Sequence, residues 1–269
     1  MNLKTPLNQI TGIGSGTLWK LKKLNIETLE DLIYHFPFRY DDFSKIVPSQ
    51  EAQIGEVVTL KGEIWSIKNI FTRSRKIITQ AIFNDGSSPI TLTWFNQSWL
   101  TKQIQTGDQL QISGKLTKYK NKLSVMVPRW EKIQDTSKPQ TLHTGRLVPI
   151  YPETARLSSK WLRLKISQLM PPKVTDPLPE NLRADMLPLS EALQKIHFPK
   201  NWQEAEKARQ RLGFDELFYV SLATQKSRME WKKKPLVSPL KINEKDLNEF
   251  TKGLPFTLTL SQQNVLEEI

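Results

Sequence analysis

A change in the spacing of hydrophobic residues between positions 50 and 132 constrains the fold more than any other feature of this chain. Apolar and polar residues alternate there in five short runs, as they do in strands that bury one face. The five runs cover residues 58–64, 77–83, 90–95, 110–116 and 123–127. The Asp85-Gly86 pair predicts a hairpin turn between the second and third strands, and Gln97–Ile104 predicts a short helix between the third and fourth.

Five strands with a helix after the third match a small OB-type barrel, a fold that commonly binds single-stranded nucleic acids. An SH3-like barrel is the structural alternative. We therefore predict an α+β protein with a five-stranded OB-type β-barrel over residues 49–132. We expect N-terminal helices and a C-terminal helical linker region to flank this barrel.

The N-terminal segment, residues 1–48, shows the spacing of helices. Leu18, Leu21 and Leu24 recur at helical intervals, and Thr28 can cap a further helix that Pro37 ends. The preceding residues 12–14, Gly-Ile-Gly, resemble the turn of a helix-hairpin-helix, in which backbone amides can hold a phosphate. The alternative is a tight turn that only packs the N-terminal helices.

Residues 133–235 form the predicted helical linker region, which starts with the polar stretch 134–139. The helices expected in it cover residues 157–170 after a Ser-Ser start, 191–196 with Ser190 as the cap, and 202–231 as one long helix. Residues 236–269 form a last, separate segment.

Several kinds of chemistry are excluded by the composition. The chain contains no cysteine, which excludes disulfides, thiolate zinc sites and cysteine nucleophiles. Its three histidines, His35, His143 and His197, lie far apart, so we expect them to pack and hydrogen-bond rather than to bind a metal. Gly114-Lys115-Leu116 lacks the upstream glycine and the hydroxyl of a phosphate-binding loop. We predict no catalytic residue, no metal site and no cofactor in this chain.

The charge of the chain points to its partner. The net charge is +12 and the isoelectric point is about 9.7, which favours a polyanion such as nucleic acid. No run approaches 18 apolar residues, and the N-terminus lacks the apolar core of a signal peptide. We therefore expect a cytoplasmic protein that has no membrane partner.

The positive charge is concentrated in the predicted barrel. Eleven basic and three acidic residues lie between Lys61 and Arg129, so this segment carries +8 of the net charge. Two basic clusters fall where loops of the barrel are expected, and loops of this kind can straddle a phosphate backbone. The residues that we predict to contact phosphates are Arg73, Arg75, Lys76, Lys102, Lys118, Lys120 and Lys122. The alternative is that these charges only keep the barrel soluble.

Phe95 and Trp99 are the candidates for contact with bases. Strand alternation places Trp94 in the core and therefore Phe95 on the outer face. Trp99 follows four residues later, at the start of the short helix, and can project from the same side. Exposed aromatic rings on a basic barrel can stack on unpaired bases. Alternatively, the two rings pack against a neighbouring helix or domain.

Several segments, taken in order along the chain, resemble RecG, the family of bacterial ATP-dependent DNA helicases. The similar segments are Gly12-Ile13-Gly14, residues 24–42, 95–100, 147–152, 192–199, 208–217 and 254–262. Among these, Ala192–Pro199 followed by Ala208–Leu217 is the most specific likeness.

The resemblance implies a role for each part of the chain. The barrel would be the wedge that splits the arms of a replication fork, and Phe95 and Trp99 would stack on the first unpaired bases of the parental strands. The family usually carries phenylalanine and tyrosine at these positions, and Trp99 keeps the stacking face. The basic loops would hold the template arms, and the long helix from Trp202 would connect the wedge to the motor.

ATP and Mg²⁺ are expected for the full-length family, whose motor follows the segment 236–269. The present sequence contains neither a phosphate-binding loop nor an Asp-Glu-x-His box. We therefore expect no ATP hydrolysis by this chain alone.

The first hypothesis is a monomeric module that binds branched DNA, both forks and Holliday junctions, within a RecG-type helicase that acts in recombination, DNA repair, fork regression and branch migration. The second is an OB-type protein-interaction module that binds an acidic tail such as that of single-strand-binding protein. The third is a general binder of single-stranded nucleic acids.

Overall fold

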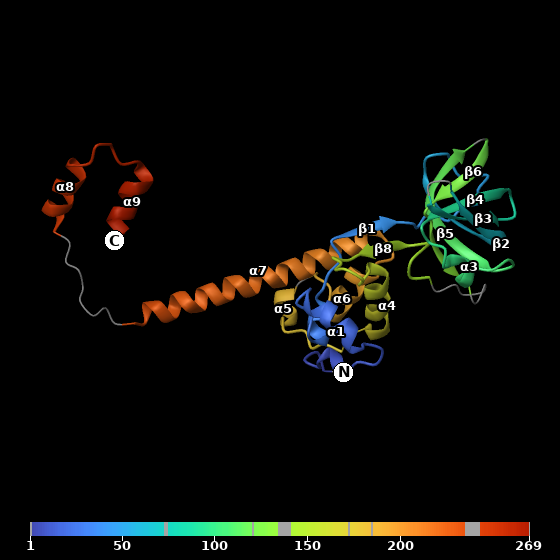
Figure 1. The fold of residues 1–269 in the computed structure, drawn as a ribbon. Coiled ribbons are helices and arrows are strands. Elements are labelled where there is room, and N and C mark those ends of the chain that lie inside the picture. The colour runs from blue at the N-terminus through green and yellow to red at the C-terminus, as the bar shows by residue number, and fades with distance from the viewer. Residues whose placement is uncertain are drawn as a thin grey trace. The chain divides into compact units, whose positions relative to one another are not determined.

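The structure of the protein is a computed structural model that describes residues 2–72, 75–119, 121–133, 141–171, 173–183, 185–234 and 243–268. The chain forms two compact units, Met1–Glu216 and Leu217–Ile269. The first unit contains a β-barrel and a helical body (Figure 1). The finer division into four segments that the sequence suggests stays a prediction.

The barrel contains the five predicted strands. They are β2 (Val57–Phe71), β3 (Ile77–Asn84), β4 (Pro89–Phe95), β5 (Gln109–Tyr119) and β6 (Lys122–Met126). Their pairings run in the order β2-β3-β4-β6-β5 and return to β2, so the sheet closes on itself. All of these pairs are antiparallel except β4 with β6. The short helix α3 (Leu100–Gln103) follows the third barrel strand, so the predicted five-stranded OB-type barrel is confirmed.

Strand β2 pairs with two other barrel strands along different parts of its length. Its first residues, Val57 to Glu63, pair with β5, and its last residues, up to Phe71, pair with β3. Gly62 lies where these two pairings meet, and a Cβ atom there would come within 2.1 Å of the Asn84 carbonyl oxygen. Only glycine permits this close approach of two backbones.

The alternation of residues did not predict three further strands. Strand β7 (Arg129–Lys132) pairs with β5, and β1 (Arg39–Asp42) pairs with β8 (Leu147–Ile150). All four residues of β8 are buried, so the strand has no polar face to produce an alternating pattern. Pro149 within it also lowers the expectation of a strand.

Among the described residues, the helical body contains η1 (Leu7–Gln9), α1 (Ser15–Lys22), α2 (Leu29–Ile33), α4 (Ser159–Leu169), α5 (Glu180–Arg183) and α6 (Leu189–His197). All of these except α5 contribute buried residues to one hydrophobic core, together with Ala208 and Leu212 of the long helix that follows. Thr28 caps α2 through the Asp31 backbone N–H, and the Asp31 carboxylate accepts from the Thr28 N–H in return, as in a capping box. The predicted cap at Thr28 is thus confirmed. Gly14 precedes α1, and the Lys165 amine lies beside this turn, 2.7 Å from the Thr11 carbonyl oxygen.

The predicted cap of α6 is wrong. The helix begins at Leu189, so Ser190 lies inside its first turn, and Pro188 occupies the cap position. The backbone N–H of Leu189, which has no acceptor within the helix, donates instead to the Asp176 carboxylate, at 2.9 Å. A carboxylate from a distant segment therefore replaces the local hydroxyl that the sequence suggested.

The same carboxylate binds a buried arginine of the long helix α7 (Trp202–Lys232). Both terminal nitrogens of Arg211 donate to Asp176, at 2.8 and 2.9 Å, and its Nε donates to Asp215 at 3.1 Å. The hydrogen bonds from Arg211 hold the pKa of Asp176 well below its usual range. This paired arginine fixes the start of α7 to the helical body.

Helix α7 confirms the predicted long helix. It contains 31 residues and therefore extends about 46 Å. Its buried residues, Ala205 to Asp215, all lie in its first half, within the first unit. The second unit also contains α8 (Glu244–Lys252) and α9 (Leu260–Glu268), which line an apolar cavity with residues such as Phe250 and Val265. Among the described residues, no helix is long and apolar enough to cross a membrane.

A polar junction ties the barrel to the helical body. The Glu131 carboxylate on β7 accepts hydrogen bonds from the backbone N–H groups of Leu142 and His143 and from the Thr144 hydroxyl, at 2.7–3.0 Å. Arg163 of α4 donates to His143 Nδ1 at 2.6 Å. The barrel is therefore joined to α4 through one carboxylate and one imidazole.

Two buried histidines predict that acid weakens the fold. Burial lowers the pKa of His197 to about 4, although its hydrogen bond to the Ile33 carbonyl raises it. Burial and the neighbouring positive charges, Arg163 first, lower the pKa of His143 to about 3. Both values lie below the unfolded value of about 6.5, so from pH 6.5 down to about pH 4 only the unfolded chain takes up these protons.

Each histidine should therefore reduce the free energy of unfolding by about 1.4 kcal/mol per pH unit below pH 6.5. Urea unfolding at pH 7, 6 and 5 measures this slope, which His143→Gln should make shallower. His35→Gln should also make the slope shallower, because burial lowers the pKa of His35 as well. A stability that is constant from pH 7 to pH 5 would contradict the prediction.

Candidate nucleic-acid interface

The exposed face of the barrel carries Phe95 at its edge. Trp94 is 1% exposed and donates from Nε1 to the Pro128 carbonyl oxygen at 3.2 Å, whereas Phe95 is 42% exposed. The alternation that the sequence predicted for these two residues is thus confirmed. Phe95 pairs with Ile78, which pairs with Ile70, so these three side chains form one row across the outer face. The next row consists of Lys68, Gln80 and Thr93.

A polar network fixes the segment between Phe95 and α3. The Asn69 amide donates to the Ser98 carbonyl oxygen at 3.1 Å and to the Thr101 hydroxyl at 3.3 Å. The Thr79 hydroxyl, which is buried, lies 2.7 Å from Asn69 Oδ1 and 3.0 Å from the Gln97 carbonyl oxygen. The backbone that leads to Trp99 is therefore held by two side chains of neighbouring strands.

Sequence reasoning missed Asn69 and Thr79. Both lie on the inward side of their strands, where a polar residue is unexpected, and this break in the alternation was the available signal. Their hydrogen bonds satisfy backbone groups that no strand or helix would otherwise use. They are positioning residues for the segment that carries Phe95 and Trp99.

Trp99 directly precedes α3 and is 48% exposed. Lys102 lies on α3 itself and is exposed. The first basic cluster lies in the turn between β2 and β3, where Arg75 and Lys76 are exposed. The predicted Arg73 lies outside the described residues. Because Asn96 donates to the Ile77 carbonyl oxygen, this turn stands beside the end of β4 that carries Phe95.

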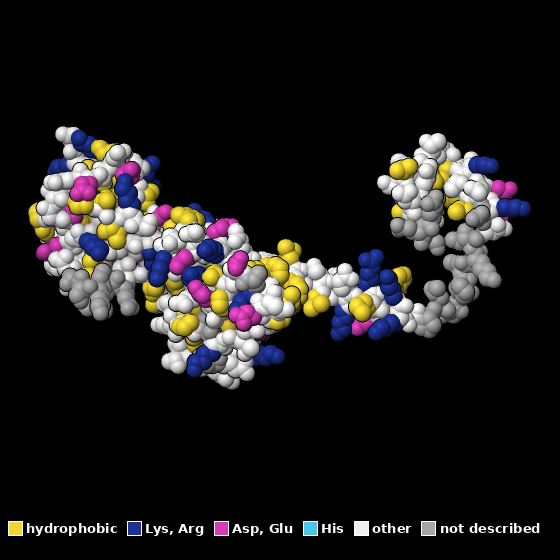
Figure 2. All heavy atoms as spheres, turned by 180° about the vertical axis from the view of Figure 1, so that it is seen from behind, with side chains coloured by type: hydrophobic (Ala, Val, Ile, Leu, Met, Phe, Trp, Pro, Cys, Tyr) yellow, Lys and Arg dark blue, Asp and Glu magenta, His cyan; other side chains and the backbone are white. Residues whose placement is uncertain are grey.

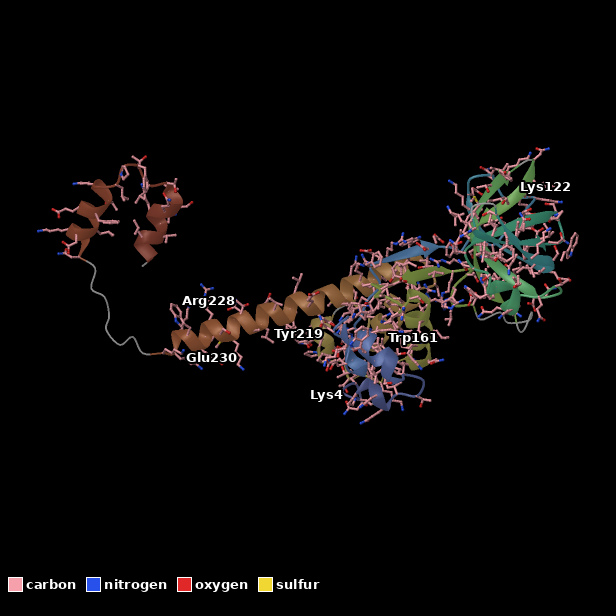
Figure 3. All side chains as sticks on the ribbon, viewed as in Figure 1. Lys4, Lys122, Trp161, Tyr219, Arg228 and Glu230 are labelled. Carbon is pink, nitrogen blue, oxygen red and sulfur yellow. The ribbon has the colours of Figure 1, made fainter. Side chains whose placement is uncertain are left out.

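The second basic cluster lies at the tip of the β5–β6 hairpin. Tyr119 pairs with Lys122 there, and Lys118 pairs with Leu123. Figure 3 shows Lys122 projecting from the extremity of the barrel. The predicted Lys120 lies outside the described residues.

The two clusters lie at opposite ends of the outer face. Strand β6 runs parallel to β4 with Ser124 opposite Thr91, so Lys122 is near the first residues of β4, whereas Phe95 is the last residue of β4. The structure thus places Phe95, Arg75, Lys76 and the Trp99–Lys102 segment at one end of the barrel, but Asn69 attaches the Trp99 segment to the side of β2 opposite to Phe95, and not to the same side as the sequence suggested. It places Lys118 and Lys122 at the other end.

The acidic residues of the barrel are occupied by internal contacts. Burial raises the pKa of Asp85, but hydrogen bonds, chiefly from Ser49, outweigh this effect and leave its pKa lowered. Burial also raises the pKa of Asp108, but the hydrogen bond from Lys132 at 2.7 Å outweighs this effect and leaves the pKa lowered. Both carboxylates therefore stay ionised and paired at neutral pH.

The basic residues of the interface are not paired in this way. Within the described part of the chain, none of the candidate basic residues forms an ion pair. Figure 2 shows Lys and Arg side chains distributed among hydrophobic ones on the visible face of the barrel. The described residues contain no group of three histidine, aspartate or glutamate side chains that could hold a metal ion. The site can therefore supply stacking surfaces and positive charge, and it needs no metal for either.

The closed barrel, with a short helix after its third strand, places the chain among the OB-type folds. Residues 6–171 match the RecG wedge domain, and the chain belongs to that family.

Relatives cover nearly the whole chain. It is 34% identical to the ATP-dependent DNA helicase RecG of Thermotoga maritima over 277 residues, which is 100% of this chain and 35% of the relative. It is 29% identical to RecG of Escherichia coli strain K12, over 98% of this chain and 39% of that protein. The chain thus spans little more than a third of the length of these curated relatives.

A solved structure shows the same arrangement of elements. The structure of a RecG bound to a three-way DNA junction is 34% identical to this chain and aligns with a TM-score of 0.70. The match covers 100% of this chain and 37% of that one.

Asn69→Ala should loosen the segment that carries the aromatic residues. The variant removes both donors to the Ser98 and Thr101 oxygens, and a cost of about 1 kcal/mol is expected for each missing hydrogen bond. Amide hydrogen exchange of residues 97–101 should become roughly thirtyfold faster, and the core strands should keep their protection. Lys68→Ala, at the exposed neighbour of Asn69, is the control, and equal exchange in both variants would refute the positioning role.

Proposed function

We propose that this chain is the part of a RecG-type ATP-dependent DNA helicase that binds branched DNA. Its substrates are replication forks and Holliday junctions, and the whole protein acts in recombination and repair by fork regression and branch migration. The observation that carries this proposal is the end of the barrel, where Phe95 and Trp99 lie exposed on a fixed backbone beside three cations. A RecG that aligns with the whole chain is bound to a three-way junction, which supports the choice of substrate.

In this mechanism the barrel acts as a wedge. The rings of Phe95 and Trp99 stack on the first unpaired bases and replace the stacking that those bases lose when the duplex opens, which is worth about 1–3 kcal/mol per base. The phosphate backbone then runs across the outer face toward Lys118 and Lys122. Lysines and arginines at both ends of that face neutralise phosphates and position the branch point.

ATP and Mg²⁺ belong to parts of the full-length family that this chain does not span. Gly114 and Lys115 lie within β5 and pair with Val58 and Val57 of β2, so their backbone amides are not arranged as a phosphate-binding loop. The described residues also offer no cluster of carboxylates for Mg²⁺. Gly114 and Lys115 therefore do not form a nucleotide site, and we propose that this chain contributes DNA binding. We place the protein in the cytoplasm, as a monomer.

A second candidate function is binding of an acidic peptide such as the tail of single-strand-binding protein. The row Ile70, Ile78 and Phe95 is an apolar strip on the outer face, and Lys68 stands in the row beside it. Such a surface suits a peptide with both acidic and apolar residues. A tight peptide complex that junction DNA does not displace would favour this function over the first.

The first test compares a labelled three-way junction with a duplex of equal length by fluorescence anisotropy. The chain should bind the junction more tightly at both of two salt concentrations, since only the junction offers unpaired bases. Replacing Phe95 and Trp99 with alanine should weaken junction binding at least about tenfold and leave duplex binding nearly unchanged.

Trp65→Ala is the matched control for that double variant, because Trp65 is 51% exposed on the barrel and stands away from the tip. Equal affinity of the wild-type chain for junction and duplex at matched salt would overturn the proposal. Site-size behaviour on single strands without junction preference would instead identify a general single-strand binder.

Replacing the basic residues should affect DNA binding differently from replacing the aromatic residues. Lys118→Ala with Lys122→Ala should weaken junction and duplex binding alike, and should lower the slope of log affinity against log salt by about one for each phosphate that is no longer neutralised. Lys4→Ala, at an exposed lysine of the helical body, should leave the slope unchanged. An unchanged slope in the double variant would show that the β5–β6 tip does not bind phosphate.

A further inference from the structure

Phe71 is an exposed aromatic residue of the barrel to which the site described above assigns no role. It is the last residue of β2, and 75% of it is exposed, which no other described aromatic residue exceeds. It pairs with Ile77 at the base of the β2–β3 turn. A bare phenylalanine ring at the tip of a hairpin contributes nothing to the core, so its place requires another explanation.

The register of the strands decides which way Phe71 points. Ile70 shares a face with Ile78 and Phe95, because residues directly opposite each other in antiparallel strands point the same way. Phe71 follows Ile70 in the same strand and therefore points to the other face of the β2–β3 ribbon. Phe95 and Phe71 thus stand on opposite faces of one ribbon.

The face that carries Phe71 is the one that holds the approach to Trp99. Asn69 lies two residues before Phe71 and points to the same side. Its amide binds the carbonyl oxygen of Ser98, the residue next to Trp99. Phe71 therefore lies one strand repeat, about 7 Å, beyond the point at which the Trp99 segment is attached.

The described residues on either side of the turn that follows Phe71 are hydrogen-bonded to one another. Thr72 donates from its N–H and its hydroxyl to the Lys76 carbonyl oxygen, both at 2.9 Å, and the Lys76 N–H donates to the Thr72 hydroxyl at 3.0 Å. Arg75, with a φ of 59°, donates from its N–H to the Thr72 carbonyl oxygen. An exposed ring at the end of a paired strand loses little backbone freedom when it binds a partner.

We infer that Phe71 is a third stacking residue, which takes the second unpaired base of the strand whose first unpaired base stacks on Trp99. This assignment rests on the proposed function. In barrels that bind single strands, successive bases stack on successive aromatic side chains along a basic groove. Trp99 and then Phe71 provide such a series on one face of the ribbon, and Arg75 and Lys76 lie within the same turn to bind the phosphate between the two bases.

The consequence is that the β2–β3 ribbon separates two strands with its two faces. Phe95 and the row beside it receive the strand on the outer face. Trp99 and Phe71 receive the strand on the opposite face, over two nucleotides. One DNA strand therefore stacks on a single ring, that of Phe95, and the other stacks on two rings, those of Trp99 and Phe71.

The test uses three-way junctions with 2-aminopurine at the first or the second unpaired position of either strand at the branch. Phe71→Ala should abolish the fluorescence change on binding at the second position of one strand only, and should weaken junction binding about tenfold. The change at the first position of that strand should persist and should disappear in Trp99→Ala. Both changes on the other strand should be unaffected by Phe71→Ala.

Two further variants separate stacking from simple apolar contact. Phe71→Tyr keeps the ring and should restore both the fluorescence change and the affinity, whereas Phe71→Leu keeps the apolar surface and should restore neither. Trp65→Ala, which removes another exposed ring of the barrel, should behave as the wild type. Because the Phe71 side chain is exposed, circular dichroism and thermal unfolding of these variants should match the wild type.

The outcomes distinguish this inference from the proposed function. If the wild-type chain prefers junctions and Phe71→Ala binds them with unchanged affinity and an unchanged 2-aminopurine signal, Phe71 is not a stacking residue, and the proposed function stands. If the wild-type chain shows no preference for junctions, the proposed function fails and the inference fails with it. A loss of signal on the strand that Phe95 serves would overturn the assignment of faces.

Discussion

The pairing of β4 with β6 is the interaction on which the site depends. It is the parallel pairing that closes the barrel, and it rests on the register of Thr91, Leu92 and Thr93 with residues 124–126. Closure assigns an inside and an outside to every strand, so Trp94 must enter the core and Phe95 must leave it. It also sets the two hairpin tips at opposite ends of one continuous face. An open sheet of the same strands would expose the edges of β4 and β6 instead.

Packing alone does not place the aromatic residues. The core fixes the strands, but the segment from Asn96 to Trp99 leaves the sheet and depends on hydrogen bonds from Asn69 and Thr79. Polar groups on the inner side of a strand require partners, and here they find them in the backbone of a functional loop. The helical body uses the same principle at a larger scale, where the Asp176 carboxylate both caps α6 and binds Arg211 of α7.

The sequence predicted those features that have a local signal. Alternation predicted the five barrel strands and the outward direction of Phe95, and helical spacing predicted the long helix from Trp202. Strand β8 was missed because its four residues are all buried, and Ser190 was misassigned because the carboxylate that caps α6 lies fourteen positions earlier in the chain. The position of one loop relative to another in the folded barrel has no local signal in the sequence either. Sequence reasoning located both basic clusters in loops, and only the strand register shows that they occupy opposite ends of the face.

Because β2 pairs with both β3 and β5, the barrel should resist a force that acts along β2 from the β2–β3 turn. In the proposed function, DNA that presses on the β2–β3 turn would load the strand lengthwise, and β2 would have to slide against its neighbours to yield. A slide of one residue would turn every inward side chain outward, from Val58 to Ile67, and would carry Gly62 away from the Asn84 carbonyl that it alone can approach. A wedge against which a duplex is driven would benefit from this stiffness, because the force on it would act along β2.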